Sequence, residues 1–531
     1  MSGSVSLTTM HRLIVGVLAA ALVTALGLVA AQEEAQHGGT LRVGYHNPMV
    51  NWDVMGTTGT RDEIAQMVLE PLVTFDAALE PQPFLAESWE VSEDELTWTF
   101  HLRQGVEFHD GSPLTSADVI ASFDRYMDMG ARRAEFERVE SWEAIDDYTV
   151  AFHLSGPWAA LPETFGMPSG GFVIHPEHVV EQVGSDLITA GDPDFLEVFI
   201  GTGPYRLVEA VAEERFRFER YENYQQPPGE ASGWAGPRGQ YSDEIIVLPI
   251  PDDATRAASL FAGEVDLADQ LPPEDFERLE QDPNTQASLI VPGRKVYLKL
   301  NSEHGPFADE LLRQAVRTAI DPEEVMFTQG PPDVWRDNTV LRYQEGQWMW
   351  DESITRPYYE VDLERARELV EQSGYDGEPI RYMITPGVPD MFRAAPLVLE
   401  VLQDIGLNAT IETFDEPTFR ERRTDLTAWE IKGATGGSVV PLAYLDASSR
   451  DRTGERWSWV PPEWDEQLDI IATELDEVRR QEAVNELNRI VIETAAELWM
   501  GEVFPVVGAR QHLNDVPDFH YMRLFDVWQD Q

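Results

Sequence analysis

The eleven histidines are the first residues of this sequence that could do chemistry, as metal ligands or as general bases. His175 and His178 are the most closely spaced pair, but Pro176 lies between them and no third ligand is evident. We therefore interpret this segment as a loop in which Pro176 opens a helix. In His109-Asp110-Gly111, the Asp-Gly step favours a turn after a strand over a catalytic pair.

Motifs for catalysis or cofactor binding give no positive signal. Gly201-Thr202-Gly203-Pro204 is a glycine turn, but no strand and helix frame it, and Pro204 lacks the N–H that a phosphate loop would use. The sequence has no GxSxG, HExxH or GxxxxGK[ST] motif. With 95 acidic residues and no cysteine, no carboxylate pair stands out and thiolate chemistry is excluded. We predict no catalytic residues, no metal site and no cofactor.

The chain whose helices and strands must position any functional site is long and very acidic. It has 531 residues, 39 Lys+Arg, 95 Asp+Glu and a formal net charge of −56. With 43 % hydrophobic residues it can bury a large core, and its length suggests roughly two to four domains. The charge repels phosphate backbones and anionic lipid heads, so nucleic acid is not an expected partner.

Lysine is almost absent from this chain. Only Lys295, Lys299 and Lys432 are lysines. An acidic surface of this kind stays soluble at high ionic strength, where screening weakens its self-repulsion. We therefore predict a salt-adapted, halophilic source.

The amino-terminal segment is typical of an export signal. Leu13 to Ala31 form an uncharged apolar run, with Arg12 before it and Val29-Ala30-Ala31 at its end. We expect residues 1–31 to be a signal peptide that is cleaved after Ala31, with an uncleaved anchor as the alternative. The remainder is then exported and periplasmic.

Alternating strand and helix patterns follow. Alternation of apolar and polar residues predicts strands at 96–102 and 150–154, after a first strand that ends at Tyr45. Apolar residues at helical spacing predict helices over 309–320 and 362–372, the second of which Gly374 closes. Interleaved elements of this kind indicate an α/β chain.

Several segments together resemble one protein family. They are 70–73 (EPLV), 85–89 (LAESW), 98–106 (WTFHLRQGV), 108–115 (FHDGSPLT), 201–205 (GTGPY), 263–266 (GEVD), 298–301 (LKLN) and 313–316 (RQAV). In this order they resemble the family 5 extracellular solute-binding proteins, the dipeptide/oligopeptide-type receptors of ABC importers. The similarity covers essentially all of residues 38–531.

The resemblance implies an α/β, two-lobed type II periplasmic-binding-protein fold with an additional accessory domain. We expect the first lobe to comprise residues 38–75, 200–290 and 495–531. The accessory domain would span 76–199 and the second lobe 291–494. A small-molecule or peptide ligand would be enclosed between the lobes by hinge closure and passed to the ABC transporter permease in the membrane, with the receptor acting as a monomer.

Candidate ligand-binding residues stand at the ends of predicted strands. Because ligands of α/β proteins bind beyond the carboxyl ends of strands, we assign Tyr45 and Asn47 after the first strand and Asn301 after the strand at 295–301. Structural hydrogen bonding at the hinge is the alternative role for Tyr45 and Asn301. Tryptophans are abundant, and Trp335 is our candidate for an aromatic wall.

A loop that begins at Lys432 departs from the family pattern. Peptide-binding relatives have a Gly-Trp-x-x-Asp-like sequence there, whose aspartate pairs with the α-amino group of the peptide. Here Gly433 matches the glycine, but Ala434 and Gly437 stand in place of Trp and Asp. We assign Gly433, Thr435 and Gly436 to the ligand site. The missing carboxylate argues against peptides with a free amine, unless another acid replaces it or the loop aligns differently.

The ligand is left open between a peptide-like solute and another polar organic solute. An oligosaccharide or a metal chelate is the alternative within the same family. Two readings from other classes are an exported hydrolase and a sensory or chaperone-like binding protein without a transporter. Fold alone does not decide among them.

Overall fold

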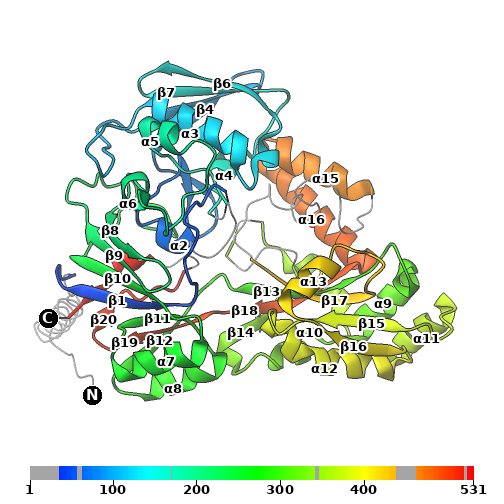
Figure 1. The fold of residues 1–531 in the computed structure, drawn as a ribbon. Helices are drawn as coiled ribbons and strands as arrows, with labels where there is room; N and C mark the ends of the chain where they lie inside the picture. Colours follow the sequence, from blue (N-terminus) through cyan, green and yellow to red (C-terminus); the bar gives the residue numbers. More distant parts are fainter. Residues whose placement is uncertain are drawn as a thin grey trace, which may run out of the picture.

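The computed structural model describes residues 35–56, 62–168, 170–340, 346–347, 349–437, 462–519 and 523–530, so the predicted signal peptide lies outside the described residues. The chain builds sheets of seven, six and four strands (Figure 1). We call the part with the seven-stranded sheet the first lobe, the part with the six-stranded sheet the second lobe, and the part with the four-stranded sheet the accessory domain. The accessory domain lies above the two lobes in Figure 1.

The first lobe is built on a sheet with the order β12-β19-β11-β1-β10-β9-β8. Strand β1 is parallel to β10 and β11, so the carboxyl ends of these three strands meet at one edge. The outer strands pair in antiparallel fashion. The elements are β1 (Thr40–Tyr45), β8 (Tyr205–Val211), β9 (Arg215–Arg220), β10 (Glu244–Pro249), β11 (Leu267–Leu271), β12 (Thr285–Leu289), β19 (Val506–Arg510), α7 (Asp253–Ala262) and α8 (Phe276–Gln281).

The second lobe is built on a sheet with the order β14-β18-β13-β17-β15-β16. Strand β15 is parallel to β16 and β17, whereas β13 is antiparallel to both of its neighbours. Its strands are β13 (Arg294–Leu300), β14 (Trp335–Asp337), β15 (Ile380–Ile384), β16 (Ala409–Thr413), β17 (Ile431–Gly437) and β18 (Glu497–Val503). Its helices are α9 (Glu310–Ala319), α10 (Pro322–Phe327), α11 (Leu363–Ser373), α12 (Pro389–Asp404), α13 (Glu416–Arg422), α15 (Pro462–Thr473) and α16 (Glu477–Thr494).

The accessory domain packs helix α3 (Ser116–Met129) on an antiparallel sheet with the order β4-β5-β7-β6. Its core is rich in aromatic rings that meet edge to face, such as Phe100 with Phe152 and Phe123 with Phe172. The strands are β4 (Ala86–Val91), β5 (Thr97–Leu102), β6 (Val139–Asp146) and β7 (Thr149–Leu154). The remaining short elements are α2 (Asp62–Ala65), α4 (Leu161–Phe165), α5 (Glu177–Val183), α6 (Phe195–Val198), β2 (Val73–Phe75), β3 (Pro81–Pro83), β20 (Leu513–Asn514) and β21 (Trp528–Gln529).

Two short crossovers join the lobes. Strand β12 ends at Leu289 and β13 begins at Arg294, and the chain returns between Val503 of β18 and Val506 of β19. One buried apolar cluster continues from the first lobe through this point into the second lobe. Strand β18 pairs with β13, so it belongs to the second-lobe sheet, although its residues fall in the range 495–531 that we expect in the first lobe.

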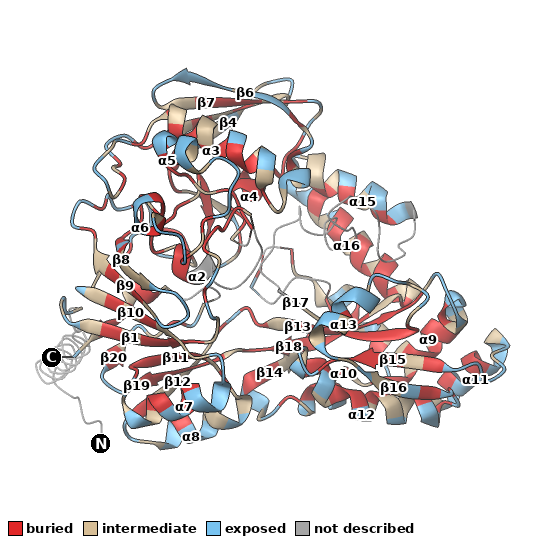
Figure 2. Cartoon of the chain, in the orientation of Figure 1, coloured by how far each residue is buried: buried red, intermediate tan, exposed pale blue. Residues whose placement is uncertain are grey.

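Local sequence patterns account for the elements. The side chains of Asp309 and Asp362 accept hydrogen bonds from the first turns of α9 and α11, and Gly374 ends α11 in the left-handed conformation at φ 74°. The predicted helices at 309–320 and 362–372 are thereby confirmed. The central strands β13 and β18 of the second-lobe sheet are buried along nearly their whole length, whereas the helices that cover the sheets expose their outer faces (Figure 2). Across the described ranges, no helix combines the length and apolar character needed to cross a membrane.

The second lobe also touches the accessory domain. Arg480 of α16 donates to Glu163 of α4 at 2.6 Å, and both side chains are buried. Nearby, the N–H of Ala160 donates to the carbonyl of Ala472 at 3.2 Å. Helices α15 and α16 therefore link the second lobe to the accessory domain independently of the crossovers (Figure 1).

Candidate functional site

A cavity of about 670 Å³ lies between the two lobes, beside the crossovers. We call it the interlobe cavity. The first lobe contributes His46, directly after β1, and Gln270 and Leu271 at the end of β11. The second lobe contributes Thr435 near the end of β17, and the return crossover contributes residues 503–506. Carboxyl ends of strands from both sheets therefore meet at this cavity, which is where α/β proteins bind their ligands.

The first-lobe wall of the interlobe cavity is organised by the buried carboxylate of Asp269. It accepts a hydrogen bond from the His46 N–H at 2.9 Å and pairs with the His46 imidazole. Arg256 reaches the same carboxylate at 3.4 Å and donates to the carbonyl oxygens of Asp269 and Gln270 at 2.7 Å each. Burial lowers the pKa of Arg256, and the Asp269 charge opposes that shift. The buried charges of this wall are therefore paired with one another.

The second-lobe wall is organised by a second buried carboxylate, that of Asp390 in α12. Arg294, the first residue of β13, binds it with Nε at 3.2 Å and Nη2 at 3.3 Å. Arg393 donates to the same carboxylate at 2.7 Å and to the side-chain oxygen of Gln329 at 3.2 Å. The wall therefore holds two guanidiniums on one carboxylate, and both arginines line the cavity.

Thr435 is the predicted ligand residue that lines the interlobe cavity. Gly436 follows it in β17, where it pairs with Lys295, and Gly437 pairs with Arg294. Gly433 serves packing, because a Cβ at this position would lie 2.6 Å from the Cβ of Met391 in α12.

Tyr45 and Asn47 lie next to the cavity rather than among its lining residues. Tyr45 is fully buried in the first-lobe core, and its carbonyl accepts a hydrogen bond from the Ile250 N–H at 2.7 Å. The Asn47 side chain accepts from the Met49 N–H at 2.9 Å, which stabilises the turn after β1. Both residues shape the backbone that presents His46.

Asn301 lies away from the interlobe cavity, whereas Trp335 does not line it but pairs with the lining residue Val503. Asn301 follows the carboxyl end of β13, and its Nδ2 donates to the carbonyl oxygens of Leu426 and Trp429. Because β13 is antiparallel to β17, the cavity lies at the opposite end of this strand, roughly 20 Å away for a seven-residue strand. Trp335 is buried in β14, where its indole N–H donates to the Gly330 carbonyl at 3.1 Å.

His109 and His175, which we singled out in the sequence, are buried in the fold. Burial lowers the pKa of His109 to about 4, and its Nε2 lies 2.9 Å from the Gly203 carbonyl oxygen. Burial also lowers the pKa of His175 to about 4. No group of three or more His, Asp or Glu side chains in the described part of the chain could hold a metal ion.

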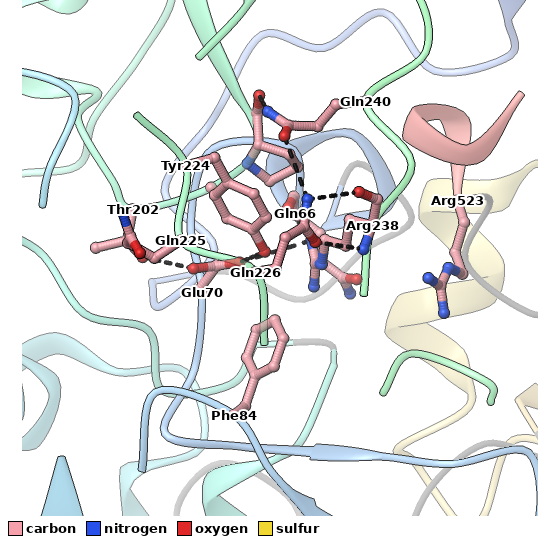
Figure 3. Close-up of polar contacts among 12 residues, drawn as sticks. Gln66, Glu70, Phe84, Thr202, Tyr224, Gln225, Gln226, Arg238, Gln240 and Arg523 are labelled. Atoms are coloured by element: carbon pink, nitrogen blue, oxygen red, sulfur yellow. Dashed lines mark hydrogen bonds and ion pairs between the residues drawn. The ribbon is translucent and has the colours of Figure 1, made fainter. Parts of the chain in front are cut away.

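A second polar cluster lies inside the first lobe (Figure 3). The buried Glu70 carboxylate accepts hydrogen bonds from the hydroxyls of Thr202 and Tyr224, each at 2.8 Å. Arg238 lies 3.9 Å from this carboxylate, and its guanidinium contacts the ring of Phe84. Burial and the Glu70 charge raise the pKa of Tyr224 well above its ordinary value.

This cluster joins distant segments of the chain and borders a second cavity of about 1010 Å³. The lining of that cavity includes Arg238 and His37, which precedes β1. It therefore does not meet the carboxyl ends of the parallel strands. We regard the smaller interlobe cavity as the functional candidate for this reason.

Sequence patterns miss the charged residues of the interlobe cavity. Asp269 and Asp390 are two among 95 acidic residues, and their neighbours in sequence give no motif. The one usable signal is Arg294, which starts a strand that also contains Lys295 and Lys299 in a chain with few cations. Its pairing with α12 depends on a tertiary contact 96 residues along the chain.

Comparison with solved structures identifies the class of fold. The structure of NikA from Brucella suis in complex with Fe(III)-EDTA matches with a TM-score of 0.78 and 21 % identity, over 93 % of this chain and 100 % of that one. The architecture is thus the two-lobed type II periplasmic-binding-protein fold with an additional domain, as the resemblance implies.

The family is shown directly by sequence. Residues 80–451 match the family model described as "Bacterial extracellular solute-binding proteins, family 5 Middle", and the chain belongs to this family. A probable peptide ABC transporter periplasmic-binding protein of Sinorhizobium fredii is 28 % identical over 77 % of this chain and 76 % of its own. Heme-binding protein A of Haemophilus influenzae is 29 % identical over 72 % and 71 %. Both relatives are named as binding proteins, the first of them as part of an ABC transporter.

Proposed function

We propose that this chain captures a polar organic solute in the interlobe cavity and delivers it to an ABC permease by closing about the two crossovers. The observation that carries this proposal is the cavity itself, whose walls come from two separate sheets joined by short connections. A ligand that touches both walls favours the closed arrangement by its differential affinity for it. A permease can then distinguish loaded from empty receptor.

The mature protein begins after Ala31 in this proposal and works as a monomer in the periplasm. The apolar run at 13–31 and the small residues at its end support export. The chain acts as a binder and not as a hydrolase, because the interlobe cavity pairs its buried charges with one another.

The ligand differs from an ordinary peptide with a free amine. Gly437 occupies the position at which peptide-binding relatives carry an aspartate, and it pairs with Arg294 in the sheet. An ammonium group placed there would meet the Arg294–Asp390 ion pair and would have no carboxylate of its own. One relative is named for a peptide transporter and another for heme binding, so membership of the family does not decide the ligand.

Mass spectrometry of small molecules released by denaturing the mature protein tests the proposal, followed by titration of the released solute into stripped protein. We expect one saturable site per chain. Thr435→Trp should fill the cavity and weaken binding at least about tenfold, because the indole takes the volume of the ligand. Thr410→Trp, at an exposed position of the edge strand β16, is the matched control and should bind normally. Turnover of the solute would instead revive the hydrolase reading.

A further inference from the structure

The second lobe is joined to the rest of the molecule at two separate places. One is the pair of crossovers, and the other is the contact of α15 and α16 with the accessory domain (Figure 1). The accessory domain is itself fixed to the first lobe, because Arg125 of α3 pairs with Asp53, which follows β1, and both side chains are buried. Val173 and Ile200 also pack against the cores of both parts. The first lobe and the accessory domain therefore form one body, which the second lobe meets at both places.

Helix α16 carries the movement of the second lobe to the accessory domain. It has 18 residues, which makes it roughly 27 Å long. Arg480 lies in its first turn, and β18 of the second-lobe sheet starts at Glu497, just after the helix ends. A rotation of the second lobe about the crossovers, in either direction, displaces the start of α16 against the accessory domain. The contact must therefore break before the lobes can change their arrangement.

The contact is small and largely polar. Arg480 donates to Glu163 of α4 at 2.6 Å, and the two side chains are only 8 % and 5 % exposed. At the surface beside them, Arg138 of the accessory domain pairs with Asp469 of α15 at 2.6 Å. Among the described residues of the second lobe, Ala472 alone packs against the apolar core of the accessory domain. Separation of the two surfaces therefore uncovers almost no apolar core.

The buried ion pair makes this contact depend on two residues at once. While Arg480 and Glu163 face each other, each charge compensates for the water that the other has lost. Without its partner, the remaining charge would be buried alone, and separation of the two surfaces would hydrate it. A contact of this kind can be released as a unit, whereas a packed apolar core cannot.

We propose that Arg480 and Glu163 form a latch that holds the second lobe against the accessory domain and releases whenever the lobes rotate about the crossovers. This inference goes beyond the proposed function, because it concerns the protein without solute. The latch selects one arrangement of the lobes in the empty protein. A solute or a permease that changes this arrangement has to offset the free energy of the latch.

Double electron–electron resonance between two spin labels measures the latch directly. The chain has no cysteine, so labels at Ala144→Cys of β6 and Thr410→Cys of β16, both exposed positions, report one distance between the accessory domain and the second lobe. In solute-free protein we expect a single narrow distribution of distances. Arg480→Met should add a longer distance that holds most of the molecules, because release hydrates the Glu163 carboxylate.

Two further variants test whether the buried charge is the cause. Arg479→Met is the matched control and should keep the single distance, because Arg479 pairs with Glu474 at the exposed surface. The double variant Arg480→Met with Glu163→Met removes both charges. It should return most molecules to the wild-type distance, because apolar side chains can replace a buried ion pair.

A second pair of labels separates release of the latch from loosening of the accessory domain. Ala144→Cys with Glu277→Cys of α8 spans the accessory domain and the first lobe, and its distance should be the same in every variant. The latch is overturned if folded Arg480→Met keeps the single distance, or if both label pairs change together. No solute is added, so these results are independent of the proposed function, which fails instead if the wild-type protein binds no solute.

Discussion

At the scale of single residues, burial decides which groups in this chain can change their charge. His175 is fully buried, and desolvation lowers its pKa to about 4, with the positive charge of Arg125 acting in the same direction and Asp53 against it. Its backbone N–H binds the Ser122 hydroxyl at 2.9 Å, so the residue is fixed in the domain. The neutral imidazole is therefore part of the folded state.

This burial predicts a pH-dependent stability. Between pH 6.5 and about 4, the unfolded chain binds a proton that the folded chain excludes, so stability is complete above pH 6.5 and falls as the pH falls. Denaturant unfolding measures the free energy of unfolding near pH 7.5 and near pH 5. Between these two pH values, the unfolding free energy of His175→Asn should fall by about 2 kcal/mol less than that of the wild type. An equal loss in both proteins would contradict the assignment.

Gly433 carries a prediction about packing. A Cβ there would lie 2.6 Å from the Cβ and 3.0 Å from the Cγ of Met391, so Gly433→Ala must push β17 away from α12. We expect a loss of about 1–3 kcal/mol in unfolding free energy, the usual cost of overpacking. Gly156→Ala is the control, since nothing lies within 4 Å of its added methyl group. A neutral Gly433→Ala would mean that the strand and helix are not packed this closely.

At the scale of elements, periodicity predicts strands and helices well but cannot predict the direction of strand pairing. Alternation in 96–102 and the caps at Asp309 and Asp362 are local signals, and the structure confirms them. Asn301 became a site candidate because we placed the ligand at the carboxyl end of its strand. Strand β13 is antiparallel to β17, so its first residue, Arg294, reaches the interlobe cavity instead.

The contact between α16 and α4 carries the next prediction. Arg480→Met leaves the buried Glu163 carboxylate without this partner, which costs about 3–5 kcal/mol for a buried pair. Arg479→Met is the adjacent control, because Arg479 pairs with Glu474 at the exposed surface, where little is lost. Unfolding free energies of both variants measure the difference. Similar small effects would show that the second lobe does not depend on the accessory domain.

At the scale of the whole molecule, the charge of −56 makes self-repulsion the main long-range force on the fold. Added salt shortens the range of this repulsion, so we expect the melting temperature to rise as potassium chloride increases from low to molar concentration. A scan of the melting temperature against salt tests the halophilic interpretation. Greatest stability at the lowest salt would contradict it.

The whole fold could be anticipated because its signals are spread along the chain. Segments from 70 to 316 match the family in order, and the family model matches residues 80–451. The site could be anticipated only in part. Thr435 lines the cavity, but Arg294, Asp390 and Asp269 meet through tertiary contacts that no local pattern encodes.

Small-angle X-ray scattering of the mature protein, stripped of solute and then saturated with the solute that it releases, tests the central claim most directly. The account predicts that the radius of gyration decreases as the lobes close, in proportion to the occupied fraction. It also predicts that Thr435→Trp does not respond at the same solute concentration. A profile that stays unchanged while the solute binds saturably would contradict closure between the lobes.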